Sequence, residues 1–289
     1  MGRIHLITIA GKHAPILPAM LSHYRRLGAD DLKVVIHSDD YRAEHIASTQ
    51  QVALEQGADV EAIAVVPWHM SLNTMIYAQV RARHPDDWFL IADQDELQTY
   101  PDGLIDVITH CERQGYDFIE GALVDRVTRT GELSPVTSAI SLWDQFPLAG
   151  LISGRIVGTC INKIVAAKGR VRLVHGQHFS LSGRGCPVES IYIQVHHFKW
   201  VDGLVPSLTA RLDHHAQYSD ECRRVIDYLR RSGRLDVERS DLMMSECVED
   251  YPHWAKVREW RTWSQVFSPD LTARANATPL AIGWRSSLA

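Results

Sequence analysis

Apolar and polar positions alternate along the first half of the chain in blocks that predict strands and helices in turn. Short apolar runs at 5–10, 32–37 and 60–66 have the length and the β-branched content of buried strands. Between them, 14–27 and 41–56 show the spacing of amphipathic helices, and each ends at a glycine, as helices commonly do. Repeated strand–helix–strand units of this size predict an α/β fold with a mostly parallel central sheet and helices on both faces.

The alternation continues through the middle of the chain. A helix is expected at 71–83, a strand from Trp88, a helix at 103–113 and a strand at 116–124. Residues 125–158 are rich in Gly and Pro and predict a long loop-rich passage, which is a common location for binding loops. Later strands are expected at 161–166, 171–174 and 192–196.

The last third of the chain has a helical pattern. Leu208 and Leu212, and later Trp254, belong to series of apolar residues at helical spacing. We therefore expect two regions, a sheet domain at 1–204 and a helical C-terminal extension at 205–289 that packs on it.

Composition mainly excludes classes of protein. The chain has 289 residues, of which 45% are hydrophobic and 22% charged, as expected for a soluble globular protein with one large core. Its first residues form too short an apolar run for a signal peptide, and no stretch approaches the ~20 apolar residues of a membrane span, so a cytoplasmic location is expected. A net charge of −5 without a basic tract argues against a nucleic-acid partner. Five scattered cysteines without a C-x-x-C pair suggest neither a disulfide framework nor a cysteine zinc site.

The candidate chemistry lies where the strand from Trp88 ends. Its apolar run stops at Asp93-Gln94-Asp95-Glu96, which places three carboxylates within four positions. In open α/β sheets, ligands bind beyond the carboxyl ends of strands, and Asp93 and Asp95 would point to the same side. Two close carboxylates repel each other, so the pattern favours a Mg²⁺ or Mn²⁺ ion between them and a phosphate. A solvated loop or a helix N-cap would also explain an acidic cluster at this position.

The order of these elements resembles family 2 glycosyltransferases and their relatives that carry a D-x-D-E motif. The resemblance covers about residues 4–200 and implies a GT-A fold, which is Rossmann-like. It also implies a nucleotide-diphosphate sugar donor, a divalent cation (Mn²⁺ or Mg²⁺) and transfer of the sugar to a hydroxyl of a glycan or small-molecule acceptor. The residues that carry it are Leu27-Gly28, Ser38-Asp39, Asn73 and the turn from Asp93 to Glu96.

The resemblance also implies roles for individual residues. Asp95 would bind the cation, Asp93 would reach the cation or the donor ribose, and the cation would neutralise the charge that grows on the departing diphosphate. Small residues at the end of the first strand would allow the nucleotide base to approach closely. The residues expected to contact the donor besides Asp93 are Thr8, Ala10, Gly11, Asp39 and Asn73, with Lys163 and Lys199 near the diphosphate.

A histidine later in the chain is expected to complete the cation site, because GT-A enzymes often use one. One candidate group contains His175 and His178, and the other is the pair His196-His197. His178 ranks first and His197 second. A histidine at the end of a strand is also often a hydrogen-bonded structural residue.

Inverting transfer requires a carboxylate that deprotonates the acceptor hydroxyl. Asp125 is the first candidate because it follows the strand at 116–124 and would face the same crevice, although a structural ion pair with Arg126 would explain it equally well. Asp144 is the second candidate. The donor sugar, the acceptor, the choice between inversion and retention and the oligomeric state are not determined by the sequence.

Two other functions fit parts of the pattern. Fifteen histidines, including the spacing His175-x-x-His178, could join the acidic cluster in a metal-dependent hydrolase, although no H-E-x-x-H motif is present. A sugar- or nucleotide-binding module without turnover is the third reading, and the intact acidic triplet argues against it.

Overall fold

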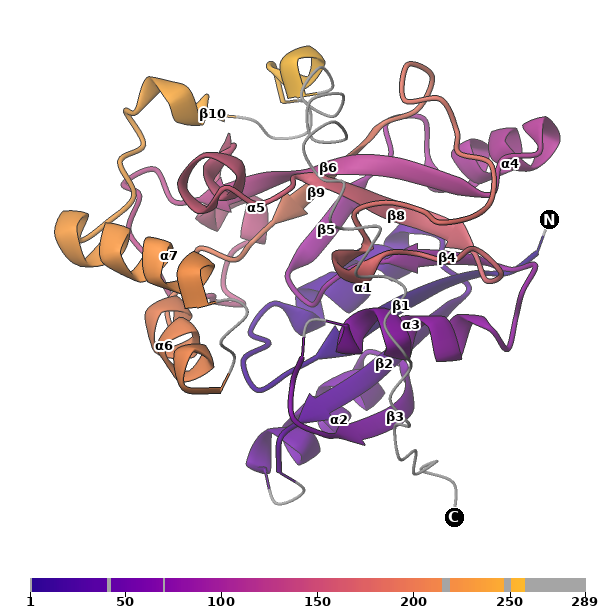
Figure 1. The fold of residues 1–289 in the computed structure, drawn as a ribbon, viewed down its shortest axis with the longest axis horizontal. Helices are drawn as coiled ribbons and strands as arrows, with labels where there is room; N and C mark the ends of the chain where they lie inside the picture. Colours follow the sequence, from indigo (N-terminus) through magenta and orange to yellow (C-terminus); the bar gives the residue numbers. More distant parts are fainter. Residues whose placement is uncertain (1, 41–42, 70, 215–218, 247–250, 258–289) are drawn as a thin grey trace.

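A ten-stranded sheet forms the centre of the molecule, and helices pack against both of its faces (Figure 1). The structure is a computed structural model that describes residues 2–40, 43–69, 71–214, 219–246 and 251–257. Along the sheet the order is β10-β7-β6-β8-β4-β1-β2-β3, while β9 pairs with both β5 and β6. The α/β fold class expected from the sequence is confirmed.

The strands and helices have the following bounds. The strands are β1 (Ile4–Ala10), β2 (Asp31–Ser38), β3 (Asp59–Val65), β4 (Trp88–Ile91), β5 (Glu96–Thr99), β6 (Phe118–Val127), β7 (Leu148–Gly150), β8 (Asn162–Lys168), β9 (Ile193–His197) and β10 (Ser245–Glu246). The α-helices are α1 (Leu17–Leu27), α2 (Glu44–Glu55), α3 (Leu72–Arg81), α4 (Leu104–Gln114), α5 (Leu142–Gln145), α6 (Leu204–His214) and α7 (Ser219–Ser232). The described residues also contain the short π-helix η1 (Ser153–Val157) and the 3₁₀ helices η2 (His175–Gln177) and η4 (Ser240–Leu242).

Strand β1 lies at the centre of the parallel part of the sheet. It pairs in parallel with β2 and β4, and β2 pairs in parallel with β3. Its side chains alternate between two cores: Ile4 and Leu6 pack with α1, α2 and α4, while Ile7 packs with α3 on the other face. Because β4, β1 and β2 run in the same direction, the segments that follow them meet at one edge of the sheet.

The remainder of the sheet is largely antiparallel and differs from the sequence expectation. Strand β8 lies antiparallel between β4 and β6, and β7 and β10 extend that side. Strands β5, β7 and β10 were not expected, and the expected strand at 171–174 is wrong, because there only Leu173 makes an isolated bridge, to Ser180. Within β5, Glu96 and Gln98 are buried polar residues. A strand with such residues lacks the run of apolar positions from which a buried strand is predicted.

Helices α6 and α7 pack through a separate apolar cluster. Leu208 and Val225 lie there with Trp200 and with Val127 from the end of β6. The division into 1–204 and 205–289 remains a prediction, and the chain from residue 258 onward lies outside the described residues. None of the helices in the described part of the chain has both the length and the apolar character needed to cross a bilayer.

Candidate active site at the carboxyl edge of the parallel strands

The acidic turn after β4 is held rigidly by its own residues and by the loop after β1. Glu96 accepts the backbone N–H of Asp93 through Oε2 (2.9 Å) and donates its own N–H to the Asp93 carbonyl (3.0 Å). Gln94 accepts the N–H of Gly11 (2.8 Å) and donates to the carbonyl of His13. The side chains of Asp93 and Asp95 remain 36% and 29% exposed, so the rigid turn presents both carboxylates to solvent.

Lys163 of β8 supplies the positive charge beneath this turn. Its ammonium group lies 2.6 Å from Asp93 Oδ2 and also donates to Glu96 Oε1. Burial lowers the pKa of Lys163, but Asp93 and Glu96 outweigh that effect and raise it above its usual value. Since the Lys163 side chain is only 4% exposed, it acts as an internal counter-ion and faces the turn from the inside.

His197 at the end of β9 lies between two carboxylates. Its Nδ1 is 3.0 Å from Asp125 Oδ1, and its Nε2 is 3.6 Å from Asp95 Oδ2. Burial lowers the pKa of His197, but the two carboxylates together raise it to about 10, so the ring is cationic at neutral pH. For Asp95, burial raises the pKa, but the charge and hydrogen bond of His197 together with the charges of Lys163 and Lys199 outweigh this and bring it to about 2. Asp95 is therefore ionised, and a cationic ring with both nitrogens facing carboxylates has no free lone pair for a metal.

Asp125 is completely buried, and both of its oxygens are engaged. Ser153 donates its hydroxyl (2.7 Å) and its backbone N–H (2.6 Å), and Trp200 donates its indole N–H (3.0 Å). Parallel pairing of β6 with β9 places Asp125 opposite His197, which allows the contact between them. Burial raises the pKa of Asp125, and the contacts with His197 and Ser153 lower it by more. Neither oxygen of the Asp125 carboxylate is accessible to the hydroxyl of an acceptor.

The close approach of β6 and β9 depends on one glycine. A Cβ atom on Gly121 of β6 would lie 2.2 Å from the carbonyl oxygen of Ile193 in β9. A side chain at this position would therefore push the two strands apart. Because Gly121 has no side chain, β6 and β9 can approach closely, which helps bring Asp125 and His197 together.

His178 offers a free ring nitrogen close to the turn. Its Nδ1 lies 2.7 Å from the carbonyl oxygen of Asn162, which assigns the ring proton to Nδ1. Burial lowers the pKa of His178 to about 4, so the ring is neutral and its Nε2 carries a lone pair. His178 thus lies against β8 at Asn162, and the next residue of that strand, Lys163, contacts Asp93 of the turn. His196, by contrast, is fully buried beneath Trp143.

The residues expected to bind the donor lie partly at the edge and partly inside the sheet. Asp39 after β2 is exposed and accepts the backbone N–H of Trp68 (3.2 Å). Gly11 is partly exposed, whereas the side chains of Thr8 and Ala10 are fully buried and do not reach the surface.

Two further candidates for donor binding are partly exposed. Asn73 lies in the first turn of α3. Lys199 follows β9. Burial has the largest effect on the pKa of Asp95 and raises it, whereas His197, Lys163 and, to a smaller degree, Lys199 lower it.

Asp144, the second candidate for the acceptor base, is exposed and accepts a hydrogen bond from Ser141 (2.7 Å) at the start of α5.

The four residues expected to bind a cation do not converge on one point in this conformation. Asp93 is engaged by Lys163, and Asp95 faces the cationic ring of His197. In the described part of the chain, one group brings three ligand atoms within 4.8 Å of one another, and it lies at the other end of β1. The donor set at the acidic turn still suits a hard divalent ion, because two carboxylates supply exposed oxygens and outnumber the single imidazole nitrogen of His178.

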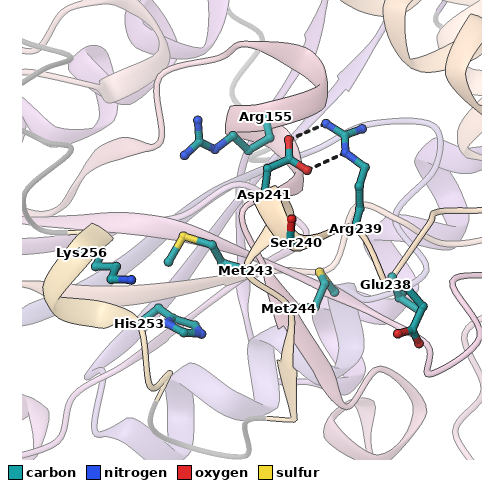
Figure 2. Close-up of a pocket in the computed structure, with 10 residues that line it drawn as sticks. Arg155, Glu238, Arg239, Ser240, Asp241, Met243, Met244, His253 and Lys256 are labelled. Atoms are coloured by element: carbon teal, nitrogen blue, oxygen red, sulfur yellow. Dashed lines mark hydrogen bonds and ion pairs between the residues drawn. The ribbon is translucent and has the colours of Figure 1, made fainter.

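A separate pocket of about 640 Å³ lies away from the acidic turn (Figure 2). Arg155 of the π-helix, Met244 and Lys256 line it, and Arg239 donates two hydrogen bonds to Asp241 beside them. None of the residues that the sequence predicts for donor, cation or acceptor binding lines this pocket.

Comparison with known proteins gives only distant similarities. No family model matches the chain, and no curated protein matches it. The chain is similar to a solved structure of a putative glucose-1-phosphate thymidylyltransferase from Bacillus anthracis in complex with sucrose, with 8% identity, a TM-score of 0.30 and coverage of 79% of this chain and 84% of that one. It is also similar to a UDP-glucose pyrophosphorylase complexed with UDP-glucose, with 10% identity, a TM-score of 0.27 and coverage of 93% and 100%. The assignment of the fold as α/β rests on the strand topology described above.

Proposed function

We propose that the protein is a cation-dependent glycosyltransferase that moves a sugar from a nucleoside-diphosphate donor to a hydroxyl of a glycan or small-molecule acceptor. The observation that carries this proposal is the rigid acidic turn from Asp93 to Glu96, with two partly exposed carboxylates at the carboxyl edge of parallel strands. Gly11 and Asp39 follow neighbouring strands at the same edge, where a nucleotide would lie.

In this proposal the acidic turn binds the cation. Asp95 and Asp93 are the oxygen ligands, and the neutral Nε2 of His178 is the nitrogen ligand. The bound Mn²⁺ or Mg²⁺ would supply charge stabilisation for the departing diphosphate. The positive charge of Lys199 also acts on Asp95, whose pKa it lowers.

The remaining donor contacts follow from the strand ends. Asp39, whose side chain is fixed by Trp68, accepts a hydrogen bond from the base or the ribose. Asn73 and Gly11 contact the nucleotide at the ends of their elements.

The geometry favours a positioning role for His197 and Asp125. Asp125 holds His197 from one side, and His197 faces Asp95 from the other, so the pair fixes the direction of the Asp95 carboxylate. Asp144, which has exposed oxygens, is the proposed acceptor base.

Replacing Asp125 with asparagine tests this arrangement. We expect the rate of sugar transfer to fall by about 10- to 100-fold, the range seen when a supporting residue is removed from a metal site, while the nucleoside diphosphate alone binds as before. Calorimetry of nucleotide binding and a transfer assay on the same preparation measure the two effects. The exposed Asp102→Asn variant is the matched control. Full transfer activity in Asp125→Asn would show that His197 does not need this partner.

The test of the function itself is calorimetric titration with UDP, GDP and dTDP, each in Mn²⁺ and each in chelator. We expect one of them to bind, and to bind only when the cation is present. Failure of all three to bind under both conditions would refute the proposal. Binding without any donor hydrolysis or transfer would instead identify a nucleotide-binding module.

A further inference from the structure

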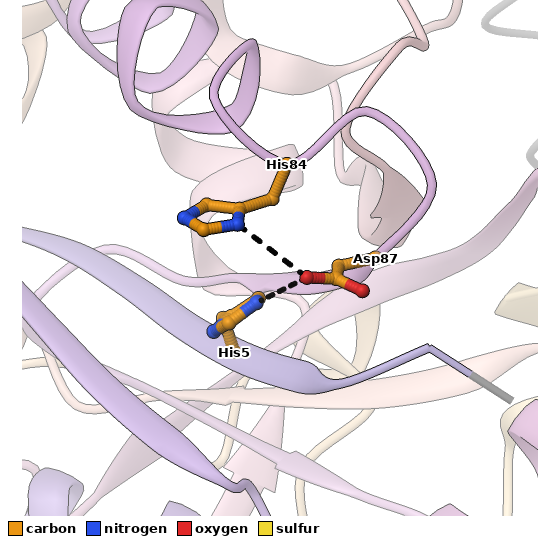
Figure 3. Close-up of side chains that lie close together, drawn as sticks. All are labelled: His5, His84 and Asp87. Carbon is orange, nitrogen blue, oxygen red and sulfur yellow. Dashed lines mark hydrogen bonds and ion pairs between the residues drawn. The ribbon is translucent and has the colours of Figure 1, made fainter.

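Two histidines and an aspartate meet at the amino end of the central strand, on the edge of the sheet opposite to the acidic turn (Figure 3). His5 belongs to β1, whereas His84 and Asp87 belong to the turn between α3 and β4. His5 Nε2 lies 3.0 Å from Asp87 Oδ2, and His84 Nδ1 lies 3.6 Å from the same oxygen. One ligand atom from each of the three residues lies within 4.8 Å of the other two.

A carboxylate, that of Asp31, lies beside the other ring nitrogen of His5. His5 Nδ1 lies 2.8 Å from Asp31 Oδ2, and Arg3 donates two hydrogen bonds to the Asp31 carboxylate (2.7 and 2.9 Å). The ring is 1% exposed and packs against Phe89 at a centroid distance of 4.8 Å. Histidines that bind metals usually have a carboxylate or carbonyl on the second nitrogen, which fixes the ring. Asp31 occupies that position here.

The turn that carries His84 and Asp87 is fixed by the backbone on both sides. Gly169 donates its N–H to the Asp87 carbonyl (3.0 Å), and Arg170 donates its N–H to the Pro85 carbonyl (2.9 Å). The Asp87 side chain also accepts the N–H of Arg3 through Oδ1 (3.0 Å). Because Oδ1 is held by Arg3, the other oxygen, Oδ2, points toward the two histidines. His84 and Asp87 are therefore already positioned to bind an ion.

The two distances to Asp87 Oδ2 and the donor types fit a zinc site. Ligand atoms around a tetrahedral Zn²⁺ with bonds of 2.0–2.1 Å lie about 3.3 Å apart, and the two distances to Asp87 Oδ2 lie on either side of that value. Two imidazoles and one carboxylate favour zinc over Mg²⁺ or Mn²⁺, which prefer ligand sets made mainly of oxygens. The His84 side chain is 44% exposed, so water can take a fourth position.

We propose that His5, His84 and Asp87 bind one Zn²⁺ ion, which fastens the start of β1 to the turn before β4. The site is independent of the proposed transferase chemistry, because its ligands lie at the opposite end of β1 from the acidic turn. Its role is structural: it joins two segments that are far apart in the chain, next to the strand on which both cores are built.

The full chain, stripped of metal and titrated with Zn²⁺ in a calorimeter, tests this proposal. We expect one zinc equivalent whose affinity falls at least about 10-fold in His84→Ala, and a rise in melting temperature with zinc that the same variant loses. His84 is partly exposed, so its replacement should leave the fold intact. The exposed His110→Ala variant is the matched control and should bind zinc as the parent protein does. Substitution by Co²⁺ should give the visible absorption of a tetrahedral site in the parent and not in His84→Ala.

The Asp95→Ala variant separates this site from the acidic turn. Zinc binding that survives in Asp95→Ala and is lost in His84→Ala supports the proposal. Zinc binding that is lost in Asp95→Ala, binding that is unchanged in His84→Ala, or the absence of zinc binding would each overturn it. The last outcome would leave His5 as an ion-pair partner of Asp31 and Asp87.

Discussion

The rate of donor turnover is expected to fall at least about 100-fold when Asp95 is replaced by alanine, while the fold stays intact. The proposed cation stabilises the leaving diphosphate by several kcal/mol, and a 100-fold loss corresponds to only about 2.7 kcal/mol of that stabilisation. Asp95 is the ligand whose removal should matter most, because it is ionised, partly exposed and held in direction by His197. Donor hydrolysis and transfer at saturating Mn²⁺ measure the effect, and circular dichroism with thermal melting reports on the fold.

Asp102→Ala is the control for this experiment, since Asp102 is an exposed aspartate in the turn after β5. Its turnover should match that of the parent protein. If Asp95→Ala keeps most of its activity, Asp95 does not bind the catalytic cation. If both variants lose activity to the same degree, the loss does not come from the acidic turn.

Replacing Lys163 with methionine is expected to lower the free energy of unfolding by about 3–5 kcal/mol, the usual cost of removing one partner of a buried ion pair. The substitution leaves Glu96, whose side chain is 2% exposed, without its cation, and leaves Asp93 with one contact fewer. Because Glu96 also holds the backbone of Asp93, the acidic turn should lose its fixed shape, and donor turnover should fall as well. Denaturant unfolding followed by fluorescence measures the stability change.

Two further variants identify the cause of that loss. Lys33→Met is the matched control: Lys33 is similarly buried and pairs with Glu61 at 2.6 Å, but Glu61 keeps a second cation in Arg83, so a smaller loss is expected. Adding Glu96→Gln to Lys163→Met removes the unpaired buried charge and should recover part of the stability. A double variant that is no more stable than Lys163→Met would show that lost packing causes the effect.

The parallel part of the fold was predictable because it follows simple periodic patterns. Helix α1 ends at Gly28, whose φ of 101° requires glycine, and β2 ends at Ser38 close to its expected position. The expected helix over 71–83 appears as α3 with slightly tighter bounds. In these segments local composition and tertiary packing favour the same structure.

The strands that were not predicted from the sequence depend on contacts between distant segments, which a pattern of apolar positions does not encode. In β5, Gln98 is buried because its side-chain amide donates to the carbonyls of Ile91 and Val165, which lie in other strands. Glu96 is buried because Lys163 is brought to it from β8. A polar residue is buried at low cost only when its partner is present, and that partner is set by the fold.

For the candidate site, the place of the acidic turn in the fold was predictable, and the contacts around it were less so. The acidic turn marked the carboxyl edge of β4, but the engagement of Asp125 depends on Trp200 and Ser153, which come from distant segments. The sequence suggested for Asp125 a role as acceptor base or, alternatively, an ion pair with its neighbour Arg126. The contact with His197 arises from the register of β6 against β9, which no local signal specifies.

The central strand β1 determines how far apart the two proposed ion sites lie. His5 is near its start and Gly11 follows its end, and six residues of extended chain span about 20 Å. This is about 2.5 times the Debye length of about 8 Å in physiological salt, so solvent ions screen most of the electrostatic influence of one end on the other. A laboratory could therefore adjust heat resistance at the amino end and donor preference at the carboxyl end as two separate engineering problems, combining the results by simple addition.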